Sequence, residues 1–170
     1  MAYGHGISVN LVQLARAYTM FATDGEVKPV TLFRTDGHVA GRPAIRPETA
    51  LAVRRMLELA VQPGGTAPKA QVIGYRVAGK TGTAHKLEGR GYTNKYVSSF
   101  VGFAPVSQPR IVVAVMIDEP SAGQHYGGAV AAPVFANVVG GALRMLGVPT
   151  DAPVDNVILP PPGLEIREET

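Results

Sequence analysis

Apolar residues recur with helical spacing in two stretches of the first third of the chain, residues 10–22 and 47–61. Asn10 is placed to cap the first helix, and a glutamine three positions later can return the hydrogen bond as in a capping box. The second helix has a proline in its first turn and ends before a Pro-Gly-Gly sequence. Arg54 and Glu58 lie four positions apart in it, which predicts a surface ion pair.

Alternating patterns predict a sheet in the second half of the chain. Residues 75–80 alternate in the manner of a strand that runs on into Lys80-Thr81-Gly82-Thr83, and residues 96–104 and 110–118 are two further strands. The last of these is continuously apolar, which predicts a central strand buried on both faces and leaves the strand with Lys80 at an edge. The polar residues 87–95 predict a mobile hairpin loop. A helix over 129–146 is apolar nearly all round, so it must be covered, most simply by the sheet.

A small β-ribbon is expected over residues 27–35 and 38–45, which flank an Asp-Gly pair typical of a type I′ turn. The predicted fold class is therefore α+β, with an antiparallel sheet, packed helices and a β-ribbon. We assign residues 1–148 to one domain or part of one. Residues 149–170 are rich in proline and charge, and are expected to be disordered or draped on the surface.

Composition and charge limit the classes of function that this chain can have. The 170 residues are 46% hydrophobic with mean hydropathy +0.12, enough for a sizeable core. The net charge is +3, but the basic residues are scattered, so a nucleic-acid partner is not expected. There is no cysteine, and His5, His38, His85 and His125 lack metal-ligand spacing, so neither metal nor cofactor is predicted. No apolar run reaches 18 residues, so no membrane span is expected in this sequence.

The candidate chemistry lies in Lys80-Thr81-Gly82-Thr83. An ammonium, two hydroxyls and a backbone without Cβ follow one another on an expected edge strand, whose free N–H groups could bind a carboxylate or an oxyanion. On an extended strand Lys80 and Gly82 share one face and the two threonines the other, so the cluster is divided unless the strand twists or ends there. A solvated strand end is the simplest alternative for such a short motif.

A second alternative is a phosphate-binding loop. Gly74, Gly79, Lys80 and Thr81 satisfy GxxxxGK[ST], and residues 111–118 would supply a strand ending in a magnesium-binding aspartate. Its context is unfavourable, because the residues after Lys80 contain three glycines and no helical period. A third alternative is the KTG element of the motif set SxxK, SxN and KTG, found in serine acyltransferases that bind penicillin.

Several runs in one order carry a family resemblance: YGHGISVNLVQLARAYTMFATDGE, PGGTA, VAGKTGTAHK, SSFVGFAP, RIVVAVMIDEP and AAPVFANVVGGAL. Together they resemble the C-terminal part of the transpeptidase domain of class B penicillin-binding proteins, most closely the division-specific septal peptidoglycan D,D-transpeptidases of the penicillin-binding protein 3 type. The resemblance covers about residues 1–148 and implies three strands of a five-stranded antiparallel sheet, hence an incomplete domain.

This resemblance implies a serine acyltransferase that cross-links peptidoglycan stem peptides at the septum and is a target of β-lactams. It implies no cofactor. The parent protein would be anchored in the bacterial inner membrane by an N-terminal helix, with its catalytic domain on the periplasmic face. Partners would be stem peptides ending in D-Ala-D-Ala and proteins of the division machinery. A non-catalytic module that binds peptidoglycan or a division partner remains the alternative, and a small NTPase a weaker one.

The resemblance assigns substrate binding to six residues: Lys80, Thr81, Gly82, Thr83, His125 and Tyr126. The ammonium of Lys80 and the threonine hydroxyls would bind the terminal carboxylate of the stem peptide or of a β-lactam. Gly82 would let the substrate backbone approach, and the backbone N–H of Thr83 would donate to the oxyanion. His125 and Tyr126 map near an aromatic wall around bound substrate, although packing in the core explains Tyr126 equally well.

The nucleophile of the family is missing from this sequence. None of the serines is followed three residues later by lysine. Ser8-Val9-Asn10 matches SxN, but these residues are interpreted as a helix cap. SxxK and the functional SxN are expected upstream of Met1 in the parent, so this chain alone is predicted to be inactive. Its apolar strand 110–118 would then present an unpaired edge, through which we expect self-association.

Overall fold

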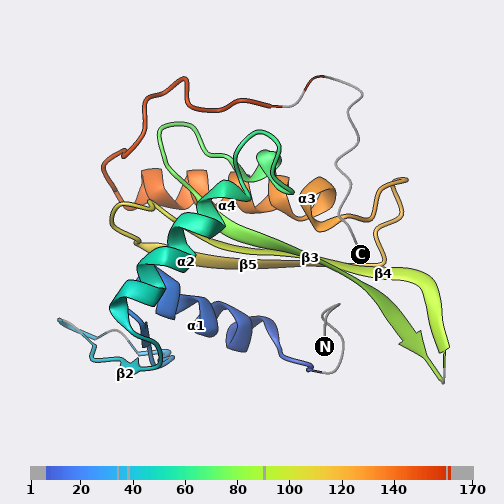
Figure 1. The fold of residues 1–170 in the computed structure, drawn as a ribbon, viewed down its shortest axis with the longest axis horizontal. Helices are drawn as coiled ribbons and strands as arrows, with labels where there is room; N and C mark the ends of the chain where they lie inside the picture. The colour runs from blue at the N-terminus through green and yellow to red at the C-terminus, as the bar shows by residue number, and fades with distance from the viewer. Residues whose placement is uncertain (1–6, 34, 38, 90, 160, 162–170) are drawn as a thin grey trace.

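A computed structural model describes residues 7–33, 35–37, 39–89, 91–159 and 161, and its centre is a three-stranded antiparallel sheet of order β3-β4-β5 (Figure 1). The elements are α1 (Leu11–Ala22), β1 (Glu26–Val27), β2 (Arg42–Pro43), α2 (Pro47–Leu59), the 3₁₀ turn η1 (Pro68–Ala70), β3 (Ala78–Glu88), β4 (Gly91–Ala104), β5 (Ile111–Asp118), α3 (Gly127–Val130) and α4 (Ala132–Met145). The predicted α+β class is confirmed.

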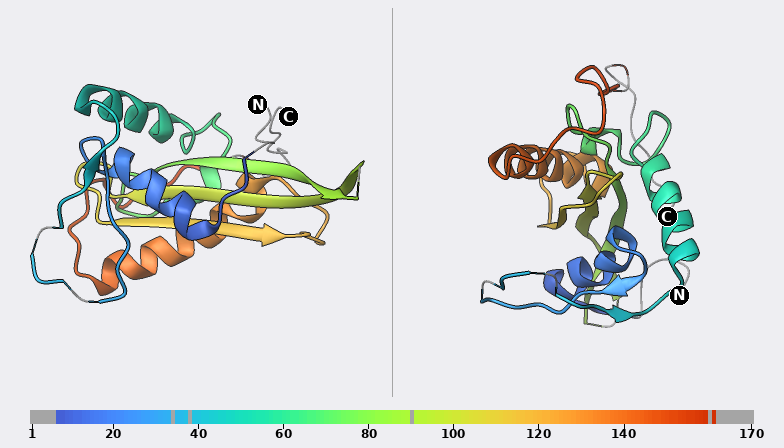
Figure 2. Two further views of the ribbon diagram at one scale, coloured as in Figure 1. Left: turned by 90° about the horizontal axis from the view of Figure 1, so that it is seen from below. Right: turned by 90° about the vertical axis from the view of Figure 1, so that its left-hand side faces the viewer.

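Helices cover both faces of the sheet, with α3 and α4 on one side and α1 and α2 on the other (Figure 2). On the α4 side the ring of Phe100 from β4 packs edge-on against Phe135, with 4.7 Å between centroids. On the other side Phe103 of β4 packs with Tyr18 and Phe21 of α1. Alternate residues of β4 therefore enter two separate cores, as a central strand requires.

The capping box of α1 forms as predicted. The side chain of Asn10 accepts from the N–H of Gln13 at 2.8 Å, and the side chain of Gln13 accepts from the N–H of Asn10 at 3.0 Å. The ion pair expected within α2 is wrong. Arg54 instead donates to the carbonyls of Phe21 and Thr23 at 2.8 and 2.9 Å, which satisfies the C-terminal end of α1.

The helix expected over 129–146 is divided in two. A short helix, α3, precedes α4, and Ala131 at their junction departs from ideal helical geometry with φ −90° and ψ −36°. A proline in the first turn of α4 explains the break, because it has no N–H to continue the ladder.

Strand β3 is shifted relative to its predicted range. It begins at Ala78 rather than at 75, because the N–H of Tyr75 bonds to the carbonyl of Val72 and that of Arg76 to the carboxylate of Asp151. It then continues to Glu88. The expected loop 87–95 is therefore wrong, since β4 begins at Gly91 and extends the hairpin ladder beyond the rest of the sheet (Figure 1).

Strand β5 is neither central nor fully buried, so that prediction is wrong. In the described sheet β4 is central, and β5 and β3 form the two edges. No residue of β5 is fully buried, and Met116 is 49% exposed. Helices contact β5 on both faces, but in the described sheet no strand pairs with its outer edge, so its side chains stay partly accessible to water. The unpaired edge expected for an incomplete domain is therefore present.

The β-ribbon is much shorter than predicted. Its ladder consists of Glu26 opposite Pro43 and Val27 opposite Arg42, and the Asp-Gly pair lies outside it. Residues 149–159 of the tail lie against the surface and make hydrogen bonds described below; residues 160 and 162–170 lie outside the described residues. Within the described part of the chain, no helix is long and apolar enough to cross a membrane.

Candidate active site

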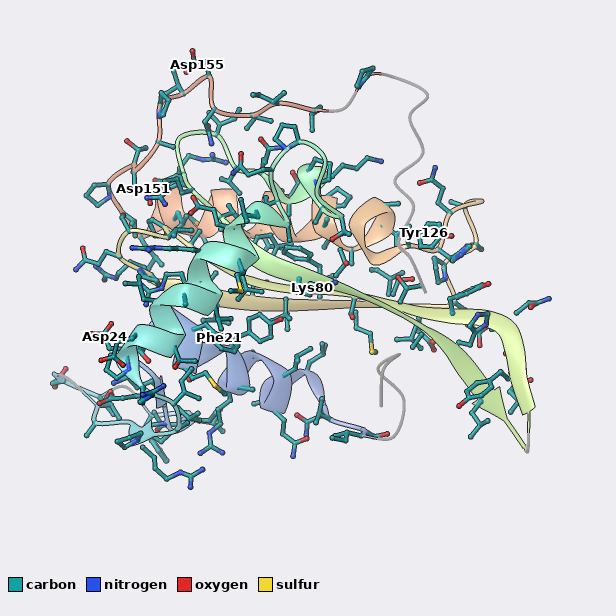
Figure 3. All side chains as sticks on the ribbon, in the orientation of Figure 1. Phe21, Asp24, Lys80, Tyr126, Asp151 and Asp155 are labelled. Carbon is teal, nitrogen blue, oxygen red and sulfur yellow. The ribbon has the colours of Figure 1, made fainter. Side chains whose placement is uncertain are left out.

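The side chain of Lys80, the third residue of the edge strand β3, lies exposed (Figure 3). It donates to the carbonyl of Thr81 at 3.2 Å and to the hydroxyl of Thr81 at 3.3 Å. The flexible lysine side chain thus joins Lys80 to Thr81, two residues whose side chains an extended strand would direct to opposite faces. Among the described residues no carboxylate forms an ion pair with Lys80, which leaves its charge available to an anionic ligand.

The hydroxyl of Thr81 is held from a second element. Thr81 is only 6% exposed and donates to the hydroxyl of Thr66 at 3.2 Å. Thr66 lies in the PGGTA loop after α2, where the N–H of Ala67 bonds back to the carbonyl of Ala60 at 2.9 Å. The sequence did not predict this contact of Thr66, although PGGTA is one of the runs that carry the family resemblance. Lys80, Thr81 and Thr66 therefore form a chain of hydrogen bonds.

Gly82 lies where two backbones approach closely. A Cβ on Gly82 would be 2.7 Å from the Ser99 hydroxyl. A Cβ on Gly127, the first residue of α3, would be 2.3 Å from the Ser99 carbonyl and 2.9 Å from the Gly82 carbonyl. The start of α3 therefore rests directly on β3 and β4, and only glycine permits this approach.

The loop before α3 is bound to the sheet by hydroxyl groups. The side-chain oxygen of Thr83 accepts from the N–H of Gly127 at 3.0 Å. On the opposing strand Ser98, fully buried, donates to the carbonyl of His125. Because Thr83 and Ser98 are directly opposite in the ladder, the loop that carries His125 and Tyr126 is fixed to β3 by one member of this pair and to β4 by the other.

Four rings from three segments form one cluster beside these hydroxyls. Tyr96 stacks on His125 with 3.9 Å between centroids, and Tyr126 lies 4.5 Å from His125. His85 lies 4.4 Å from Tyr96 and is opposite it in the ladder between β3 and β4. The structure thus brings His125 and Tyr126 together and adds Tyr96 and His85, which sequence reasoning missed. Tyr126 is half-buried in this surface cluster rather than packed in either core.

A second lysine on β3 has a different environment. Lys86 donates to Asp118 at 3.0 Å and to Glu119 at 2.7 Å. The hydrogen bonds that Lys86 donates to Glu119 and then to Asp118 raise the pKa of Lys86, and the bond from Lys86 lowers the pKa of Glu119. Lys80 and Lys86 therefore differ in their surroundings. Lys80 has no acidic partner in the described structure, whereas the charge of Lys86 is paired with Asp118 and Glu119.

The geometry excludes the phosphate-loop alternative. A phosphate loop needs a helix that begins at Lys80, so that the helix N-terminus can bind the phosphate. Lys80 instead lies within strand β3, which continues to Glu88. Gly74 belongs to a turn closed by the bond from Tyr75 to Val72. The described residues also contain no group of three or more His, Asp or Glu side chains that could hold a metal ion.

A helix-covered antiparallel sheet with KTG on an edge strand is the arrangement that the resemblance to penicillin-binding transpeptidase domains predicts. The family model "Penicillin binding protein transpeptidase domain" matches residues 1–140, and this chain belongs to that family. The chain is 45% identical to the probable peptidoglycan D,D-transpeptidase PenA of Neisseria flavescens over 157 residues, 92% of this chain and 39% of that protein. It is 42% identical to the peptidoglycan D,D-transpeptidase FtsI of Escherichia coli K12 over 153 residues, 89% of this chain and 26% of that protein.

A solved structure agrees with these relatives. The apo transpeptidase domain of penicillin-binding protein 3 from Burkholderia pseudomallei superposes with a TM-score of 0.84 and 56% sequence identity, over 90% of this chain and 47% of that chain. The chain thus spans less than half of that structure and 26% to 39% of the two curated relatives. The resemblance to septal transpeptidases is confirmed at the level of the family and its relatives.

Proposed function

We propose that this chain forms the substrate-carboxylate side of the active site of a septal peptidoglycan D,D-transpeptidase. The parent would be anchored in the inner membrane and act on its periplasmic face with proteins of the division machinery. The observation that carries the proposal is the exposed ammonium of Lys80 beside the Thr81 hydroxyl on an edge strand, without an acidic partner among the described residues. Such a group recognises a free carboxylate, the feature shared by stem peptides ending in D-Ala-D-Ala and by β-lactams.

In this proposal Lys80, Thr81 and Thr83 hold the carboxylate, and the N–H of Thr83 donates to the oxyanion of the tetrahedral intermediate. Loss of one such oxyanion donor typically lowers the rate by about 100- to 1000-fold. The reaction is acyl transfer. A serine from the upstream part of the parent protein attacks the penultimate D-Ala carbonyl, and the terminal D-Ala leaves. An amine of a second stem peptide then attacks the acyl-enzyme, which forms the cross-link and frees the serine. His125 and Tyr126 would line the bound peptide.

The first experiment compares this chain with the longer protein that contains SxxK and SxN. After incubation with a fluorescent penicillin, we expect the longer protein to gain the mass of one acyl group, while the 170-residue chain gains none because it has no serine in the SxxK pattern. Intact-protein mass spectrometry measures both. A stoichiometric adduct on the chain alone would contradict the assignment of the nucleophile to other polypeptide.

The same measurement separates the catalytic proposal from the non-catalytic alternative. A module that only binds peptidoglycan or a division partner would hold penicillin or stem peptide reversibly. The longer protein would then show binding without a covalent adduct. That outcome would favour the binding module.

We also propose that the chain by itself associates through the outer edge of β5. In the described sheet this edge carries no hydrogen-bonded neighbour, and the strand is apolar from Ile111 to Ile117. Light scattering is expected to give a mass above that of a monomer, and Met116→Lys, at the exposed apolar position of β5, is expected to reduce it. A monodisperse monomer whose β5 amides are protected from hydrogen exchange would refute this proposal.

A further inference from the structure

The segment that follows α4 lies along the turn that leads into β3. This C-terminal strap, residues 149–159, crosses above the turn on the α4 side of the sheet (Figure 1). The turn runs from Val72 to Tyr75, and Gly74 adopts a positive φ of 79° within it. A Cβ on Gly74 would lie 2.9 Å from the side chain of Thr150, so the strap is in direct contact with the turn.

One side chain of the strap binds three backbone groups of this turn. Asn156 accepts from the N–H of Gly74 at 2.9 Å and donates to the carbonyls of Val72 and Tyr75, both at 3.1 Å. An amide side chain is needed for this pattern, because only Asn or Gln combines an acceptor with two donors. Asn156 therefore recognises the conformation of the turn.

A second side chain joins the turn to the exit of β4, which lies beside the entry of β3 at the open end of the hairpin. The carboxylate of Asp151 accepts from the N–H of Arg76 at 2.7 Å and from the N–H of Ser107 at 3.0 Å. Arg76 lies two residues before β3 begins, and Ser107 follows the end of β4. The N–H of Asp151 itself donates to the carbonyl of Gly74 at 3.1 Å. Asp151 thus connects the entry of β3, the exit of β4 and the turn.

Two further contacts hold the strap at its ends. Gln71 bonds to both backbone groups of Ile158, donating to its carbonyl at 2.8 Å and accepting from its N–H at 2.9 Å. The buried hydroxyl of Tyr75 donates to the carbonyl of Val148 at 2.7 Å. These bonds use backbone groups of Ile158 in the strap and of Val148 just before it, so the position of the strap is set by Gln71, which precedes the turn, and by Tyr75, the last residue of the turn.

We propose that the strap is a clip and that Asp151 and Asn156 are positioning residues for the KTG strand. Within the described sheet β3 is paired only with β4, so no strand on its outer side fixes its position. The clip fixes its entry instead, four residues before Lys80. The functional part of this inference rests on the proposed role of Lys80; the structural part does not.

The test uses the longer protein and three variants: Asp151→Ala, Asn156→Asp and Asp155→Ala. Asn156→Asp keeps the shape but replaces two donors by a carboxylate facing carbonyls. Asp155 is the matched control, because it lies in the same strap with its side chain exposed (Figure 3). Hydrogen exchange under native conditions is expected to be about tenfold faster at the amides of residues 74–80 in the first two variants and unchanged in the control.

Acylation by fluorescent penicillin tests the link to the site. Asp151→Ala is expected to slow acylation roughly tenfold, since small displacements of binding groups are costly. It should have little further effect in a Lys80→Ala background, because it acts through Lys80; a general loss of stability would slow both backgrounds equally.

Each outcome decides one part of the inference. Unchanged exchange at residues 74–80 in both strap variants would overturn the clip. Faster exchange with normal acylation, while Lys80→Ala is slow, would overturn the positioning role. If Lys80→Ala is itself acylated normally, the proposed function fails, and the exchange rates still decide whether the strap holds β3.

Discussion

Replacing Lys80 with alanine in the longer protein is expected to slow acylation by a fluorescent penicillin about 10- to 100-fold. The ammonium is exposed and lacks an acidic partner within the described structure, so its charge is available to the ligand carboxylate. A hydrogen bond to a charged group is worth about 1.5 to 3 kcal/mol, and each 1.4 kcal/mol is a factor of ten in rate. Stopped-flow measurement of the second-order acylation rate constant gives the value.

Lys86→Ala is the matched control for that substitution. It removes the same side chain from the same strand, but its ammonium is already paired with Asp118 and Glu119. An exposed pair of this kind contributes little to stability. We expect the acylation rate to change less than about twofold. Equal losses for the two lysines would indicate that only the net charge of the hairpin matters, and the carboxylate site would have to be abandoned.

Gly127→Ala is expected to slow acylation roughly 100-fold. The added Cβ would lie 2.3 Å from the Ser99 carbonyl, so α3 must move away from the sheet. Movement breaks the bond from Gly127 to Thr83 and displaces the loop that carries Tyr126. A shift of about 1 Å in binding groups can cost a factor of this size. The same acylation assay measures it, with circular dichroism to verify that the variant is folded.

Gly141→Ala is the control for this second prediction. Gly141 lies in α4 with no atom within 4 Å of a Cβ built on it. Alanine favours a helix over glycine by about 1 kcal/mol, so this variant should be as stable as the parent or more so, with normal acylation. If Gly127→Ala is acylated as fast as Gly141→Ala, the contact between α3 and the KTG strand has no role in the reaction.

Local signals in the sequence were sufficient for much of the helical structure. Asn10 has its capping partner three positions away, so the start of α1 is decided within one turn of chain. The strands were harder, because their ends depend on distant partners. The N–H of Arg76 is taken by Asp151, 75 positions away, and nothing near Arg76 indicates that β3 cannot begin there.

The place of β5 in the sheet depends on the same kind of distant information. An apolar strand is fully buried only when helices cover its faces and strands pair with both of its edges. In the described fold β5 has a strand neighbour, β4, at one edge. Its hydrophobic pattern indicates a strand but not the identity of its neighbours.

The candidate site shows the same division. Lys80, Thr81, Gly82 and Thr83 are contiguous, so one motif was enough to find them. Tyr96 was missed because its place beside His125 depends on the register of β3 against β4 and on the docking of a later loop. Contacts of this kind become predictable only once the pairing is known.

The central claim, that Lys80 binds the carboxylate of the ligand, is tested most directly by two penicillins that differ only in that group. Acylation rates of the longer protein and its Lys80→Ala variant are measured with the free acid and with its methyl ester. We expect the substitution to slow the free acid about 10- to 100-fold and the ester less than about twofold, because the ester offers no charge to lose. An equal loss with both penicillins would contradict the claim.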